Sequence, residues 1–128
     1  MKYFNVSQLI LRIAAGGMML THGYPKFLKV INGNFSFGDP IGLGEEVSLV
    51  LAVFAEFICS ILVVLGFYTR LATVPLIFTM LVAVFLVNGS DPFSKQELGL
   101  MYAAMFTAIG LMGPGKFSID SARGNRKY

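Results

Sequence analysis

The segment VSLVLAVFAEFICSILVVLGFY, residues 47–68, decides the fold class of this chain. It is apolar almost throughout and long enough to cross a membrane, since a spanning helix needs roughly 20 mostly apolar residues. Its one charged residue, Glu56, lies near the middle. A charge inside a membrane span is rare and usually faces the interior of a helix bundle. The segment therefore predicts a membrane helix with a charged inner face.

Three further apolar runs accompany this segment. Residues 71–87 are long enough as they stand, and residues 6–21 and 98–112 become long enough when their ends are extended. The sequence therefore predicts an all-α, multi-pass membrane protein. A single domain, residues 1–128, is expected to form a bundle of four transmembrane helices. The expected helices are 5–24, 45–66, 71–87 and 97–113.

The composition supports a membrane protein and excludes several other classes. Hydrophobic residues make up 55% of the chain and charged residues only 13%, which is too apolar for a small soluble domain with its large relative surface. The net charge of +3 comes from basic residues near helix ends and in the tail, so anionic lipid is a better partner than nucleic acid. One cysteine and one histidine provide neither an intrachain disulfide nor a metal-ligand cluster.

The basic residues predict an orientation in the membrane. With four spans, the face that holds both termini carries six of them: Lys2, Arg70, Lys116, Arg123, Arg126 and Lys127. The opposite face carries three: Lys26, Lys29 and Lys95. Because lysine and arginine favour the cytoplasmic side, both termini are expected in the cytoplasm. The long polar loop, residues 26–46, is then expected outside.

Arg12 interrupts the first apolar run as Glu56 interrupts the second. Both charges have small or polar neighbours three and four positions away, a pattern typical of faces that pack against other helices. On one interpretation they form a buried ion pair that fixes the register of two helices. On another they belong to a functional site for a polar ligand or a proton path. On a third, Arg12 reaches the membrane surface and Glu56 is protonated.

A second group of polar residues is expected at the outer end of the bundle. His22 and Lys26 follow the first span, and Glu97 opens the fourth. Each can be explained as a charge that offsets a helix dipole. Their shared position above Glu56 also fits the mouth of a ligand site. The candidate ligand-binding residues are Arg12, His22, Lys26, Glu56 and Glu97, and no catalytic residue is assigned.

Four motifs along the chain resemble those of the DoxX family. They are Arg12-x3-Gly16-x5-His22-Gly23-x2-Lys26-Phe27, then Glu56, then Leu65-Gly66-x2-Thr69-Arg70, then Gly113-Pro114-Gly115-Lys116-Phe117-Ser118-Ile119-Asp120. The resemblance implies a four-helix protein of the bacterial cytoplasmic (inner) membrane. The archetype of that family is associated with a thiosulfate:quinone oxidoreductase. The chain departs from the family at Cys59-Ser60, near which the family usually has a glycine pair.

These observations favour a membrane subunit of a redox system linked to quinone. A quinone needs an apolar slot with polar groups at its carbonyl oxygens. Arg12, Glu56 and the polar residues around His22 at the outer end of the bundle could supply these groups. Whether the chain is itself an enzyme is not decided by its sequence. The alternatives are a small carrier or channel for a polar solute, and a non-enzymatic scaffold for a partner enzyme. Expected partners are the lipid bilayer and either a redox protein or a second copy of the chain.

Overall fold

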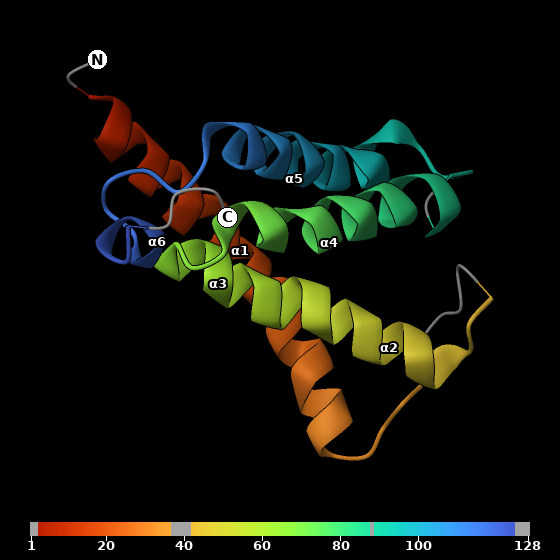
Figure 1. The fold of residues 1–128 in the computed structure, drawn as a ribbon. Helices are drawn as coiled ribbons and strands as arrows, with labels where there is room; N and C mark the ends of the chain where they lie inside the picture. Colours follow the sequence, from red (N-terminus) through yellow and green to blue (C-terminus); the bar gives the residue numbers. More distant parts are fainter. Residues whose placement is uncertain (1–2, 37–41, 88, 125–128) are drawn as a thin grey trace.

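The computed structural model describes residues 3–36, 42–87 and 89–124, and within these ranges the chain is helical, without a strand. The α-helices and the two π-helices, η1 and η2, are shown in Figure 1. Their bounds are α1 Phe4–Ile31, α2 Glu45–Val53, η1 Phe54–Cys59, α3 Ser60–Leu65, α4 Thr69–Val82, η2 Ala83–Val87, α5 Phe93–Met112 and α6 Ile119–Ala122. The prediction of an all-helical chain is confirmed.

Two helical rods are long and apolar enough to cross a membrane. One is Glu45–Leu65, formed by α2, η1 and α3, and the other is Thr69–Val87, formed by α4 and η2. Their lengths of 21 and 19 residues match the thickness of a hydrocarbon core. The helices α1 and α5 are also long, with 28 and 20 residues. The predicted total of four spans and the location of the termini stay predictions.

The first helix is longer than the sequence predicted. It was expected to end near Pro25, but α1 continues through this proline to Ile31. Contacts with η1 hold the residues beyond Pro25: Lys26 binds Glu56, and the rings of Phe27 and Phe57 stack with centroids 4.4 Å apart. These tertiary contacts offset the local cost of the proline. The predicted loop therefore begins only at about residue 32, and its residues 37–41 lie outside the described part.

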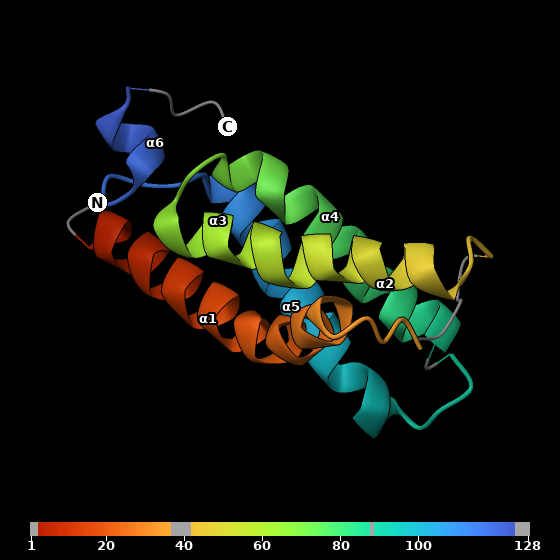
Figure 2. The ribbon, with the colours of Figure 1, turned by 90° about the horizontal axis from the view of Figure 1, so that it is seen from below.

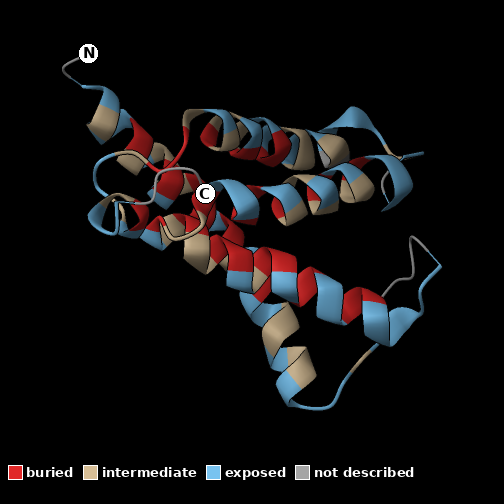
Figure 3. Ribbon diagram, viewed as in Figure 1, coloured by how far each residue is buried: buried red, intermediate tan, exposed pale blue. Residues whose placement is uncertain are grey.

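The helices pack around one inner face (Figures 1 and 2). Helix α1 contacts α3, η1 and α5, and α4 contacts α5. One stripe of α1 is buried, with the three- and four-residue spacing of a helix face: Gln8, Arg12, Ala15, Gly16, Met19 and Gly23. Figure 3 shows the buried residues turned inward and the exposed ones on the outer faces. Many of those outer residues are large and apolar, such as Phe78, Phe85 and Leu111, as expected for a surface that meets lipid.

Gly23 lets α1 and η1 come into backbone contact. A Cβ atom at this position would lie only 2.5 Å from the carbonyl oxygen of Glu56. Any other residue would push the two helices apart, so the glycine sets how α1 crosses η1. The contact places the last turns of α1 beside Glu56.

Candidate functional site

The centre of the candidate site is an ion pair between Lys26 of α1 and Glu56 of η1. The ammonium nitrogen of Lys26 lies 2.6 Å from each carboxylate oxygen of Glu56. The Glu56 side chain is only 4% exposed, whereas that of Lys26 is 27% exposed. A carboxylate so deeply buried keeps its charge only with a close cation. The interpretation that paired Glu56 with Arg12 is therefore wrong, because Lys26 occupies that role.

Arg12 is buried, as predicted. It lies in the N-terminal half of α1, away from Lys26, and binds backbone carbonyl groups of other segments. Its guanidinium donates to the carbonyl oxygens of Val63 and Val64, each at 3.2 Å, and to that of Phe117. The carbonyls of Val63 and Val64 belong to the last turn of α3, where some carbonyls lack helical partners and a cation is favoured. Arg12 thus caps α3 and ties the C-terminal segment to it.

Asp120 completes this attachment of the C-terminal segment. Its carboxylate accepts hydrogen bonds from the backbone N–H groups of Tyr68 and Thr69, at 2.8 and 3.0 Å, and from the Thr69 hydroxyl at 3.1 Å. These donors lie at the start of α4, where helix N–H groups need acceptors. Asp120 was not among the predicted residues. The only sequence signal for it was its place at the end of the Gly113–Asp120 motif.

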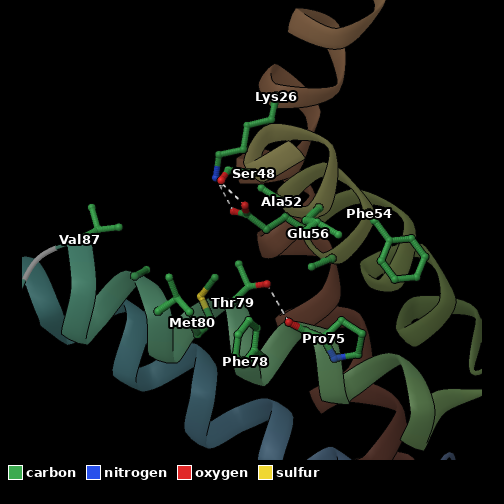
Figure 4. Close-up of a pocket in the computed structure, with 14 residues that line it drawn as sticks. Lys26, Ser48, Ala52, Phe54, Glu56, Pro75, Phe78, Thr79, Met80 and Val87 are labelled. Atoms are coloured by element: carbon green, nitrogen blue, oxygen red, sulfur yellow. Dashed lines mark hydrogen bonds and ion pairs between the residues drawn. The ribbon is translucent and has the colours of Figure 1, made fainter. Parts of the chain in front are cut away.

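A cavity of about 450 Å³, called here the apolar cavity, lies between α2–η1 and α4–η2 (Figure 4). In Figure 4, Lys26, Ser48 and Glu56 lie together on one side, opposite Phe78 and Met80. The hydroxyl of Thr79 donates to the carbonyl of its own helix at Pro75, 2.8 Å away. The lining consists of Lys26, Ser48, Leu51, Ala52, Phe54, Ala55, Glu56, Pro75, Phe78, Thr79, Met80, Val82, Ala83 and Val87.

A second, smaller cavity of about 210 Å³ is also lined by the ion pair and is called here the polar cavity. Helices α1, η1, α4, η2 and α5 all contribute to it. Its lining consists of Met19, His22, Lys26, Glu56, Met80, Ala83, Val84, Leu98, Gly99 and Tyr102. Four of these residues, Lys26, Glu56, Met80 and Ala83, also line the apolar cavity. The ion pair is therefore part of a wall common to both cavities.

The structure brings three of the five candidate ligand-binding residues together. His22, Lys26 and Glu56 line the polar cavity, whereas Arg12 and the exposed Glu97 line neither cavity. The functional role of all five stays a prediction. Tyr102 also lines the polar cavity, and its ring meets that of His22 edge-on with centroids 5.7 Å apart. A tyrosine within an apolar helix gives no sequence signal of such a position.

Both π-helices border the apolar cavity. Glu56 lies within η1, and Ala83 and Val87 begin and end η2. A π-helical turn accommodates an extra residue in a helix and is frequently found at functional sites. Within the described part of the chain, no three His, Cys, Asp or Glu side chains are grouped so that they could hold a metal ion. The arrangement offers a binding site with one ionic end.

These features define a helical membrane protein with a buried ion pair beside two cavities. The family is shown by sequence: the chain belongs to the DoxX family, whose pattern matches residues 7–89. The predicted membership of the DoxX family is thereby confirmed.

Three relatives cover most of this chain. An "Uncharacterized protein" of Haemophilus influenzae is 30% identical over 94% of this chain and 92% of its own length. The "Putative oxidoreductase CatD" of Bacillus subtilis is 33% identical over 86% of this chain and 80% of its own. An uncharacterized membrane protein of Mycobacterium tuberculosis is 27% identical over 89% of this chain and 79% of its own length. No solved structure matches the chain.

Proposed function

We propose that this DoxX-family protein is a membrane subunit of a redox system and binds a quinone in the apolar cavity. The observation that carries the proposal is the lining of that cavity, which is apolar except for Ser48, Thr79 and the Lys26–Glu56 pair. Its volume of about 450 Å³ lies within the range of roughly 300–1,000 Å³ that is typical of small-molecule sites. The name of the Bacillus subtilis relative supports a link to redox chemistry.

The chemistry of the lining suits a quinone in two respects. Its ring and its isoprenoid chain are apolar and match the side chains of α2, α4 and η2. Its carbonyl oxygens accept hydrogen bonds, and Lys26 is a donor at the ionic end. When bound, a quinone supplies electron-acceptor chemistry. The residues of this chain bind it, orient its ring and shield it from water. The proposal includes thiosulfate as the reductant, as the family resemblance implies.

Quinone retention tests this proposal. Ala52→Phe fills the apolar cavity without touching the polar cavity, and Ala104→Phe places the same ring on the exposed face of α5. Lipid-soluble molecules would be extracted from each purified protein and quinone measured per mole of chain. We expect quinone with the unmodified chain and with Ala104→Phe, and about tenfold less with Ala52→Phe, since a tenfold loss needs only about 1.4 kcal/mol. Equal quinone in both variants would refute the assignment of the cavity.

The proposal includes four membrane spans in the bacterial cytoplasmic membrane with both termini inside. The six-to-three distribution of lysine and arginine supports this orientation. A fluorescent protein fused after Tyr128 should fluoresce, because it folds in the cytoplasm. Alkaline phosphatase, which is active only outside, should be active when inserted near Gly38. Active phosphatase at the C-terminus would contradict the orientation.

A carrier for a polar solute is the second candidate. The observation that favours it is the polar cavity, which shares a wall with the apolar cavity at the ion pair. Intramembrane charges also mark solute pathways. Solute flux through quinone-free liposomes that contain only this protein would support the carrier, and the quinone extraction above would then give no quinone.

A further inference from the structure

We propose that the polar cavity is a second ligand site, which takes a small, neutral, hydrogen-bonding solute from water. The bound solute would contact Tyr102 and lie beside the Lys26–Glu56 pair. This inference does not depend on what fills the apolar cavity. It rests on a tyrosine hydroxyl that has no hydrogen bond within the described part of the chain, on the charge balance of the lining, and on the position of the cavity in the bundle.

Tyr102 provides the first argument. The residue is only 4% exposed, and among the described residues its hydroxyl forms no hydrogen bond with another protein group. The hydroxyl is accessible and is not one of the buried side-chain atoms that lack a partner, and Tyr102 lines the polar cavity. A tyrosine hydroxyl can both donate and accept a hydrogen bond, so it is available to a bound solute. His22 packs edge-on against the Tyr102 ring and lines the same cavity.

The charge balance selects the kind of ligand. The charge of Lys26 is offset by that of Glu56, with 2.6 Å between the charged atoms. No other lining residue is an aspartate, glutamate, lysine or arginine. An ion in this cavity would lose its hydration without gaining an opposite charge, which is costly. A neutral solute with hydrogen-bonding groups loses far less. The volume of about 210 Å³ equals about seven water molecules at roughly 30 Å³ each, so the solute has only a few non-hydrogen atoms.

The position of the cavity indicates entry from water. Leu98 and Gly99 line it, and they lie only about 8–9 Å along α5 from its first residue, Phe93, at 1.5 Å per residue. Polar residues Gly89–Pro92 directly precede that helix. The exposed imidazole of His22 lies at the same cavity. The polar cavity is thus placed for entry from water, whereas the quinone proposed for the apolar cavity would come from the bilayer.

Cysteine labelling tests the difference in access. In a Cys59→Ala background, Val84→Cys reports on the polar cavity alone and Ala55→Cys on the apolar cavity alone. The two positions match in burial, since each is 2% exposed. The rate with 2-hydroxyethyl methanethiosulfonate, which is neutral and forms hydrogen bonds, is divided by the rate with propyl methanethiosulfonate, which has nearly the same shape and an apolar tail. This division cancels differences in thiol reactivity. We expect the ratio to be about tenfold higher at Val84→Cys, because burying a hydroxyl group in an apolar cavity without a hydrogen bond is costly. Equal ratios would overturn the assignment of access.

Protection from labelling tests the ligand class. Acetamide and acetate have nearly the same shape, but only acetate is charged. Acetamide should slow modification of Val84→Cys, and acetate should not. Adding Tyr102→Phe should weaken the acetamide effect about fivefold, the cost of one hydrogen bond.

Three outcomes of the protection experiment would overturn the proposal: protection by acetate alone, protection by neither probe, and protection that Tyr102→Phe leaves unchanged. If Val84→Cys fails to fold, Met19→Cys replaces it, since Met19 is 1% exposed and lines only the polar cavity. Quinone extraction from the same Tyr102→Phe protein should be unaffected, which separates this site from the apolar cavity.

Discussion

Replacing Lys26 by methionine is expected to lower the free energy of unfolding by about 3–5 kcal/mol, the usual cost of leaving one member of a buried ion pair without its partner. The Glu56 carboxylate is 4% exposed and would have no cation at 2.6 Å. The double variant Lys26→Met/Glu56→Leu should recover most of the loss, because no buried charge remains. Unfolding by denaturing detergent, followed by circular dichroism in mild micelles, measures four proteins: the unmodified chain, Lys26→Met, Glu56→Leu and the double variant.

Lys29→Met is the matched control for this experiment. Lys29 lies three residues further along α1, lines neither cavity, and donates to the carbonyl of Ser36 at the surface. Its replacement should change stability by no more than about 0.5 kcal/mol, as surface substitutions usually do. If the double variant is as unstable as the sum of the two single variants, Lys26 and Glu56 do not stabilise each other. Coupling found instead between Arg12 and Glu56 would restore the interpretation that the structure rejects.

The second large effect is expected at Asp120. Asp120→Ala leaves three donors at the start of α4 without an acceptor, and each costs about 1–3 kcal/mol when buried. The loss should therefore exceed about 3 kcal/mol, and the C-terminal segment should detach. Detachment is measured as faster trypsin cleavage after Lys116. Asp120→Asn should also destabilise, because its amide would bring a donor towards donors that need an acceptor.

Arg12→Leu is expected to release the same segment from the other side, since Phe117 would lose the guanidinium. Phe117→Ala retains the backbone carbonyl that Arg12 binds. It should leave the attachment in place, because the bond involves no side-chain atom of Phe117. Unchanged trypsin cleavage in both Asp120→Ala and Arg12→Leu would show that these residues do not hold the segment.

The apolar runs and the burial of two charges could be predicted from the sequence, but their partners could not. The error lies at Pro25, which was expected to end the first helix and so placed Lys26 in a loop. In the structure the helix continues, and the 14 positions from Arg12 to Lys26 span about 21 Å at 1.5 Å per residue. Arg12 and Lys26 therefore bind groups at opposite ends of the bundle, although both belong to α1. The prediction failed because tertiary contacts decided a helix end that local propensity alone assigns wrongly.

Tyr102 and Asp120 could not be predicted for a different reason. Tyr102 lies in residues 98–112, the part of α5 that is apolar on all sides, so no periodic pattern distinguishes its inner face. Asp120 lies in the four-residue helix α6, and its importance depends on the donors of α4 that are distant in sequence. His22 and Lys26 were found because they are polar residues at the end of an apolar run, where the sequence itself shows the contrast.

The contact at Gly23 sets the length of the ion pair. Because the backbones of α1 and η1 touch there, the helices that carry Lys26 and Glu56 cannot approach further. A side chain at position 23 would separate the two backbones and draw the ammonium group of Lys26 away from the carboxylate of Glu56, which now lies 2.6 Å from it. Gly23 therefore controls the strength of an interaction to which it contributes no atom.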